Sequence, residues 1–210
     1  MKAEIIYIDK NPTDAVRLAK NIYLEGGVFV YPTDTIYGFG ANPFNEEAIQ
    51  RINLIKGREK WKRYILLISS IEDLRRYVEL NSEKHFDYLL SIWPNPVSVV
   101  LKLNSEMKKL FNSGTSAFRI PNHRFCRQLL DELKMPLIST SVNRTEEEPL
   151  NDSTVISEIF GNEVDAIFYN KKKSFFQAST LIDLTGDEPL LIREGKIKFD
   201  DLMKKFISPF

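Results

Sequence analysis

The sequence predicts an α/β domain built on an open, twisted, mixed β-sheet that is flanked by helices. Short apolar runs of strand length alternate along the chain with segments in which apolar residues recur every three or four positions, the spacing of one buried helix face. Such alternation is typical of a sheet covered by helices. No internal repeat, low-complexity segment or linker divides the sequence, so we expect residues 1–210 to form a single domain.

The expected helices begin at capping residues. Asn11 followed by Pro12 predicts the start of the first helix, because proline fits the first helical position. Asn45 caps the second helix, and Ser70 caps a short third one with capping-box spacing. Further helices are expected at residues 82–91, 125–134, 154–160 and 199–206.

Apolar runs predict the strands between these helices. Val28–Tyr31, for example, is a run of strand length that leads into the turn-forming residues Pro32–Thr35. The expected strands cover residues 4–8, 28–31, 64–69, 97–103, 116–120, 137–139, 164–168, 180–184 and 190–192.

The charge balance argues against a uniformly basic nucleic-acid surface. The chain carries 29 Lys and Arg residues against 29 Asp and Glu residues, so its formal net charge at pH 7 is zero. The densest positive cluster is Lys56–Arg63, with five positive charges and one negative charge in eight residues. This cluster predicts a local anion site in a neutral protein. A structural alternative for its first residues is that cations stabilise the C-terminal end of a helix.

Few side chains offer nucleophilic or metal chemistry. Cys126 is the single cysteine and lies on an apolar helix stripe, which predicts a buried, inert thiol. We expect His85 on an exposed helix face and His123 in a surface or capping role, so neither a metal site nor a histidine-based hydrolase is favoured. The lone cysteine and the lack of a signal peptide or an 18-residue apolar run predict a soluble cytoplasmic protein that does not enter a membrane.

Hydroxyl, amide and cationic side chains stand instead at the ends of predicted strands. Because ligands bind beyond the carboxyl ends of strands in open α/β sheets, we expect these segments to converge on one pocket. Arginine forks onto phosphate or carboxylate oxygens and hydroxyls complete the cradle, although each hydroxyl alone also fits a turn or cap. The residues are Thr33, Asp34, Thr35, Arg119, Thr140, Ser141, Asn143, Ser179 and Arg193.

Several segments match a known family when they are taken together and in order. They are Tyr31–Gly40 (YPTDTIYGFG), Lys56-Gly57-Arg58 with Lys62, Trp93–Leu101 (WPNPVSVVL), Arg119-Ile120-Pro121, Ser139–Asn143 (STSVN), Ser179–Asp183 (STLID) and Leu191–Gly195 (LIREG). On these motifs the chain resembles the YrdC-like family, the L-threonylcarbamoyladenylate synthases, in its short single-domain form. The resemblance runs from about residue 28 to residue 196.

The resemblance implies a YrdC-like fold with a basic substrate cleft and a nucleotidyltransferase activity. Threonine, bicarbonate and ATP, with Mg²⁺ bound to the nucleotide, would give threonylcarbamoyl-AMP and pyrophosphate. Partner proteins would then transfer the threonylcarbamoyl group to adenosine 37 of tRNA, which this chain would contact only indirectly or weakly. Aligning three reactants and neutralising phosphate charge needs no protein nucleophile, which suits the residues present.

Site residues are implied by the same matches. Lys56 and Arg58 would be catalytic, and Thr35, Arg119 and Ser179 would bind threonine, with Arg119 pairing the substrate carboxylate. The residues expected to bind ATP are Arg58, Lys62, Thr115, Ser139, Ser141, Asn143 and Arg193.

The chain also departs from the family pattern. Glu59 and Glu194 replace the usual prolines, and Glu146–Glu148 place three carboxylates beside the expected triphosphate, which they would repel unless they point away or hold a cation. Two alternatives therefore stay open, namely a paralogue with another nucleotide-dependent activity and a non-catalytic RNA-binding protein that uses the basic cluster with Trp61 and Tyr64. The substitution Arg58→Ala distinguishes these hypotheses. If the cluster binds a triphosphate, ATP-dependent turnover should be lost; if it is an RNA surface, the salt dependence of RNA binding should become weaker.

Overall fold

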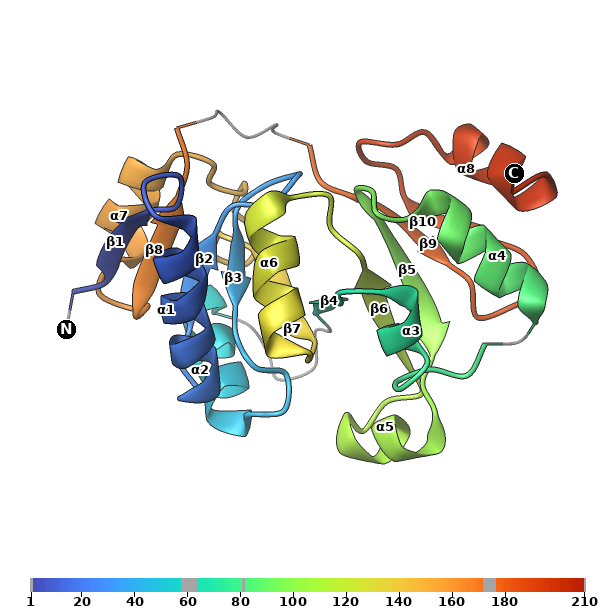
Figure 1. The fold of residues 1–210 in the computed structure, drawn as a ribbon, viewed down its shortest axis with the longest axis horizontal. Helices are drawn as coiled ribbons and strands as arrows, with labels where there is room; N and C mark the ends of the chain where they lie inside the picture. The colour runs from blue at the N-terminus through green and yellow to red at the C-terminus, as the bar shows by residue number, and fades with distance from the viewer. Residues whose placement is uncertain (1, 58–63, 81, 172–176, 210) are drawn as a thin grey trace.

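The computed structural model describes residues 2–57, 64–80, 82–171 and 177–209, which form an α/β fold (Figure 1). Within these residues ten strands make one sheet of order β1-β8-β2-β3-β7-β4-β6-β5-β9-β10. The predicted mixed sheet flanked by helices is confirmed. The strands are β1 (Glu4–Tyr7), β2 (Phe29–Tyr31), β3 (Gly38–Gly40), β4 (Ile65–Leu67), β5 (Val97–Lys102), β6 (Thr115–Arg119), β7 (Leu137–Ser141), β8 (Ala166–Tyr169), β9 (Thr180–Asp183) and β10 (Leu190–Arg193).

The helices begin where the sequence predicts caps. The side-chain oxygen of Asn45 accepts a hydrogen bond from the backbone N–H of Ala48 at 2.9 Å, and the Ser70 hydroxyl accepts one from Asp73 at 3.1 Å. These bonds satisfy backbone donors that the first helical turn leaves free. The helices are α1 (Pro12–Leu24), α2 (Glu46–Lys56), α3 (Ile71–Leu74), α4 (Glu83–Ile92), α5 (Ser105–Leu110), α6 (Arg124–Leu133), α7 (Ser153–Phe160) and α8 (Phe199–Ile207).

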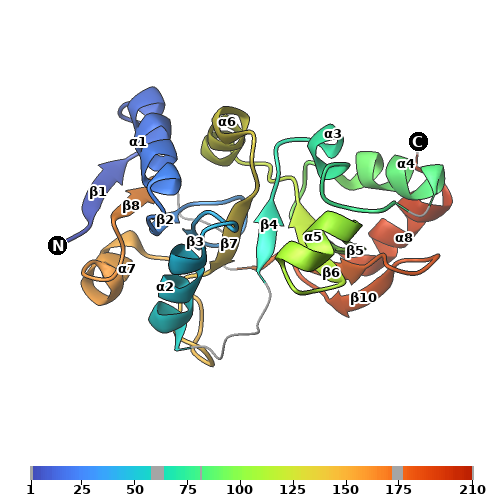
Figure 2. The ribbon, with the colours of Figure 1, turned by 90° about the horizontal axis from the view of Figure 1, so that it is seen from below.

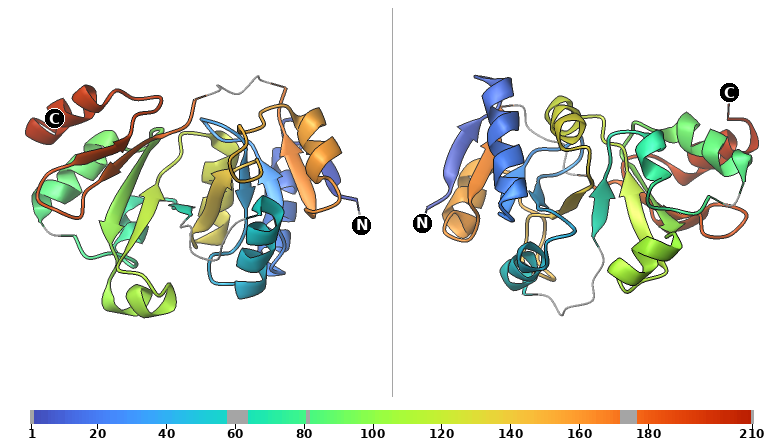
Figure 3. Two further views of the ribbon diagram at one scale, coloured as in Figure 1. Left: turned by 180° about the vertical axis from the view of Figure 1, so that it is seen from behind. Right: turned by 60° about the horizontal axis from the view of Figure 1, so that its bottom comes forward.

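The core lies on both faces of the sheet. Side chains alternate between the two faces of a strand, so Phe29 and Tyr31 pack under α1 and α6 while Val30 packs toward α2 and α7. Figure 2 shows α1 and α6 on one side of the sheet and α2 and α7 on the other. At the opposite end from β1, α4 and α8 contact each other (Figure 3).

The strands run in mixed directions, and this places the ends of different strands beside one another. Both sheet neighbours of β7, which are β3 and β4, run antiparallel to it, whereas β4 and β6 run parallel. The carboxyl end of β7 therefore adjoins the amino end of β4. Polar residues at the two kinds of strand end are brought together in the centre of the sheet.

Two elements were not expected from the sequence. Strand β3 consists of Gly38, Phe39 and Gly40, and glycine-rich segments carry little strand propensity. Packing requires glycine at position 40, because a Cβ atom there would lie 2.8 Å from the Tyr31 ring. The other unpredicted element is the short helix α5.

The expectation that His85 is exposed is wrong. His85 is only 3% exposed, and its Nε2–H donates a hydrogen bond to the carbonyl oxygen of Asp187 at 3.1 Å. The buried positions of α4 are His85, Tyr88, Leu89 and Ile92, which follow helical spacing, and α8 covers this face through Phe206. The same spacing was visible in the sequence.

Cys126 lies where it was expected. Its thiol is fully buried and contacts the carbonyl oxygen of Pro32 at 3.3 Å, and burial raises its pKa far above that of an ordinary cysteine. Across the described ranges, no helix combines the length and the apolar character needed to cross a bilayer.

Candidate functional site

A cavity of about 260 Å³ collects most of the predicted site residues. Residues at the amino ends of some strands and at the carboxyl ends of others contribute to this cavity. The open-sheet rule, by contrast, predicts a site beyond the carboxyl ends alone. The physical reason for the difference is the mixed strand direction. Its lining comprises Thr35, Ile36, Tyr37, Gly38, Tyr64, Ile65, Arg119, Ser139, Thr140, Ser141, Pro149, Ala178, Ser179, Leu181 and Arg193.

Strand β7 supplies the hydroxyls at the centre of the cavity. Leu137, Ser139 and Ser141 share one face of this strand because side chains alternate. Leu137 belongs to the core under α6, and the two serines continue the same face into the cavity. β7 extends through Ser141, although a loop was expected to begin after Ser139. The hydroxyl of buried Tyr31 donates a hydrogen bond to the carbonyl oxygen of Ile138, the residue before Ser139, at 3.3 Å.

The segment after β2 places Thr35 next to Arg119. Thr35 is 3% exposed, and its Oγ1 lies 2.9 Å from Thr33 Oγ1 and accepts a hydrogen bond from Arg119 Nη1 at 3.1 Å. Arg119 Nη2 forms an ion pair with Asp34 Oδ1. A buried guanidinium thus sits at the wall of the cavity between a hydroxyl and a carboxylate.

Ser179 stands at the start of β9 on the opposite wall. Its hydroxyl lies 2.9 Å from that of the fully buried Ser98, and its carbonyl oxygen accepts a hydrogen bond from Arg193 Nη2 at 3.0 Å. Arg193 is exposed and is the last residue of β10, whereas the sequence predicted it just after that strand. Gly195 follows in close contact with the backbone of Ala178 and Ser179, so β10 and its continuation hold this wall in place.

Lys56 lies beneath the cavity and does not line it. The side chain has no exposed surface, and its ammonium donates to the carbonyl oxygen of Ser141 and to both the carbonyl and side-chain oxygens of Asn143, the last two at 2.9 Å. Asn143 is also buried and accepts a hydrogen bond from the Ser141 hydroxyl at 2.6 Å. These contacts give Lys56 and Asn143 a supporting position under the Ser141 segment.

The other predicted residues lie elsewhere. Thr115 stands four residues before Arg119 on β6, roughly 13 Å along the strand, and does not line this cavity. Arg58 and Lys62, together with Glu59 and Trp61, lie outside the described residues. The convergence expected from the sequence is therefore observed for Thr35, Arg119, Ser139, Thr140, Ser141, Ser179 and Arg193. Thr33 and Asp34 were also expected in this pocket, but they line a different cavity.

The acidic residues that depart from the family pattern stay out of the cavity. Glu146, Glu147 and Glu148 are all exposed, and none belongs to the lining. Glu194 accepts hydrogen bonds from the Lys198 ammonium at 2.8 Å and from the Phe199 N–H at 3.1 Å, and these contacts lower its pKa. None of these four carboxylates is therefore part of the cavity wall.

Apolar lining residues were missed by the sequence reasoning. Ile36, Ile65, Pro149 and Leu181 give the cavity an apolar wall, and Tyr64 joins them, with its hydroxyl 2.5 Å from Asn53 Oδ1. Ile36, Ile65 and Leu181 each lie within a polar motif or next to one, and this position was the only sequence feature that could have indicated them as lining residues. Their inward orientation depends on strand register and could not be read from the motif itself.

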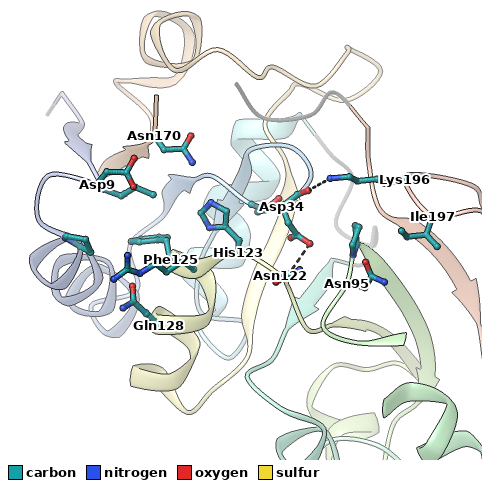
Figure 4. A pocket seen from close by; sticks show the side chains of 15 residues that line it. Asp9, Asp34, Asn95, Asn122, His123, Phe125, Gln128, Asn170, Lys196 and Ile197 are labelled. Atoms are coloured by element: carbon teal, nitrogen blue, oxygen red, sulfur yellow. Dashed lines mark hydrogen bonds between the residues drawn. The ribbon is translucent and has the colours of Figure 1, made fainter. Parts of the chain in front are cut away.

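A second cavity of about 570 Å³ is lined by Thr33 and Asp34 and shares no lining residue with the first (Figure 4). Asp34 belongs to its wall, between Asn122 and Lys196. The backbone N–H of Asn122 donates to Asp34 Oδ2 at 3.2 Å, and the Lys196 ammonium donates to the Asp34 carbonyl oxygen at 3.1 Å. Asp34 is therefore held by two residues that line the second cavity.

The fold and the site together define an α/β protein whose central cavity is lined by hydroxyl side chains and by two arginines, Arg119 and Arg193. Residues 21–195 match the model of the Sua5/YciO/YrdC family, described as telomere recombination, and the chain belongs to this family.

Solved structures agree with this assignment. P. abyssi Sua5 complexed with L-threonine is 28% identical with a TM-score of 0.83, and the match covers 92% of this chain and 57% of that one. A doubly substituted P. abyssi Sua5 is 27% identical with a TM-score of 0.86, over 96% of this chain and 63% of that one. E. coli YciO is 26% identical with a TM-score of 0.85, over 95% and 99%. The chain thus spans about three-fifths of the Sua5 chains and nearly all of YciO.

Proposed function

We propose that the protein is an L-threonylcarbamoyladenylate synthase, a nucleotidyltransferase that condenses L-threonine, bicarbonate and ATP. The observation that carries the proposal is the convergence of Thr35, Arg119 and Ser179 with Ser139 and Ser141 on one cavity. The similarity to a Sua5 structure complexed with L-threonine supports an amino-acid substrate. The product would serve the formation of threonylcarbamoyladenosine at position 37 of tRNA, through downstream transfer proteins.

The proposed roles follow from the side chains. Arg119 binds the threonine carboxylate, while Thr35 and Ser179 hydrogen-bond to the amino acid on two walls of the cavity. Ser139, Ser141 and Arg193 bind the nucleotide phosphates, and Lys56 and Asn143 hold the Ser141 segment in position. The apolar wall that includes Ile36 and Leu181 accepts the substrate methyl group or the nucleotide base.

The reaction consists of two bond-forming steps. The threonine amine combines with bicarbonate to give a carbamate and water, and a carbamate oxygen then attacks the α-phosphorus of ATP with release of pyrophosphate. Both steps depend on the alignment of reactants and the neutralisation of phosphate charge, which arginine and hydroxyl donors provide. Among the described residues no group of three or more His, Cys, Asp or Glu side chains could hold a metal ion. We propose that Mg²⁺ arrives with ATP and is bound by phosphate oxygens and water.

The experiment follows pyrophosphate and labelled adenylate after threonine, labelled bicarbonate, Mg²⁺ and ATP are mixed with the protein. We expect pyrophosphate release only with all three substrates. Arg193→Gln should abolish it, whereas Arg51→Gln, which breaks a half-exposed pair with Asp165 away from the cavity, should not. No threonine-dependent release from folded protein would contradict the proposal.

A second candidate is a different nucleotide-dependent activity on the same fold. It is favoured by the match to E. coli YciO, which is nearly as long as this chain, whereas Sua5 is longer. Nucleotide turnover that is independent of threonine would identify this alternative. Serine in place of threonine in the same assay tests whether the cavity uses the substrate methyl group.

A further inference from the structure

Asp34 and Arg119 form a buried ion pair, and the proposed reaction assigns a role only to Arg119. The Arg119 side chain is 4% exposed and the Asp34 side chain 10% exposed, so both charges are withdrawn from water. Burying a charge is costly unless it is paired and hydrogen-bonded. The pair is therefore a fixed part of the site.

One N–H donor of Arg119 has no acceptor in the part of the chain that the structure describes. A guanidinium carries five N–H donors, and here Nη1 binds Thr35 while Nη2 binds Asp34. The Nε atom is buried and, within the described residues, has no hydrogen-bond partner. A buried donor without an acceptor costs free energy, so an acceptor that reached this N–H would remove that cost.

Asp34 is itself held rigidly. Its Oδ1 binds Arg119 and its Oδ2 accepts the Asn122 N–H, while its carbonyl oxygen accepts from Lys196 (Figure 4). These partners belong to two segments, the stretch from Arg119 to Asn122 and the loop that contains Lys196. Asp34 does not line the candidate site, but its side chain contacts Arg119, which does.

We infer that Asp34 is a positioning residue that fixes the Arg119 guanidinium so that one edge remains for a substrate carboxylate. The inference rests on the proposed function of Arg119. Asparagine cannot replace Asp34, because it offers one acceptor oxygen where both Arg119 and Asn122 need one. The role is thus specific to a carboxylate with two acceptor oxygens.

Binding measurements with two ligands test the inference. We expect Asp34→Asn to weaken L-threonine binding about tenfold by calorimetry, since a hydrogen bond to a charged group is lost. Binding of L-threoninamide, which lacks the carboxylate, should stay unchanged, because Arg119 has no anion to receive. Asp165→Asn breaks an Arg–Asp pair outside the cavity and should alter neither affinity. Equal losses for both ligands, or unchanged threonine affinity, would overturn the inference.

A second measurement needs no ligand. The Nη signals of Arg119 in ¹⁵N NMR, assigned through Arg119→Lys, should show restricted guanidinium rotation in the wild-type protein and faster rotation in Asp34→Asn. Asp34→Glu, which keeps the charge but displaces it, should behave in the same way if the asparagine variant fails to fold. Unchanged Arg119 rotation in a folded variant would refute the positioning role. Absent threonine binding with normal NMR behaviour would instead contradict the proposed function.

Discussion

Ser98 and Ser179 share a hydrogen bond of 2.9 Å between their hydroxyl oxygens, although 81 positions separate them in the chain. Ser98 lies on β5 and is fully buried, while Ser179 precedes the parallel strand β9 and lines the cavity. The pairing of β5 with β9 thus places Ser98 where its hydroxyl orients that of Ser179, a proposed substrate contact.

The first prediction concerns this bond. Ser98→Ala should raise the KM for L-threonine roughly two- to tenfold, since the Ser179 hydroxyl loses the partner that orients it. Ser91→Ala removes a helix hydroxyl that bonds to Tyr88 and serves as the control. Steady-state kinetics with varied threonine give the comparison. An unchanged KM would show that Ser179 is oriented without Ser98.

The second prediction separates support from catalysis at Lys56. Lys56→Met should lower the free energy of unfolding by about 2–4 kcal/mol, because it leaves buried oxygens of Ser141 and Asn143 unpaired. Urea denaturation measures this change. Lys20→Met removes an exposed pair with Glu132 and should cost less than about 1 kcal/mol. Full stability with lost turnover would instead indicate a direct catalytic role.

The third prediction concerns the stability contributed by Arg119. Arg119→Gln should lower the free energy of unfolding by about 3–5 kcal/mol, because the buried Asp34 carboxylate loses its counter-charge. Arg51→Gln, at a half-exposed pair, should lower it by less than about 1 kcal/mol. Equal effects of the two substitutions in urea denaturation would contradict the importance of burial.

The fourth prediction uses two glycines. A Cβ atom at Gly195 would lie 2.5 Å from the carbonyl carbon of Ser179, so Gly195→Ala should displace this wall of the cavity and reduce turnover. A Cβ atom at Gly186 would have no neighbouring atom within 4 Å, so Gly186→Ala should leave turnover unchanged. Turnover of the two variants, measured beside their thermal stability, distinguishes the outcomes.

The fifth prediction concerns alkaline pH. Burial raises the pKa values of Tyr23, Tyr88 and Cys126 above their ordinary range. The unfolded chain therefore releases these protons first, and the stability they support should be complete below about pH 8.5 and fall as pH rises past about 10. Denaturation midpoints at neutral and alkaline pH, followed with tyrosinate absorbance, test this sign. Midpoints that rise with pH would contradict it.

The sequence predicts the elements well where local chemistry decides them. The capping bonds of Asn45 and Ser70 and the buried stripe of α6 are local features, and all were predicted. It fails at β3, where Gly38 and Gly40 belong to a strand that pairs with β2 and β7, and where aromatic rings leave no room for a side chain at Gly40. It also fails at His85, whose burial depends on α8.

For the site, motif chemistry in the sequence determined which hydroxyls and arginines matter, because residue type decides what can bind an anion. Only the tertiary structure decided that Thr35, Arg119 and Ser179 face one cavity, that Lys56 supports it from below, and that Asp34 holds Arg119. The hydrogen bonds Lys56–Asn143, Ser98–Ser179 and Arg119–Thr35 each join residues more than 80 positions apart. They depend on mixed strand directions and sheet register, which no local pattern of residues encodes.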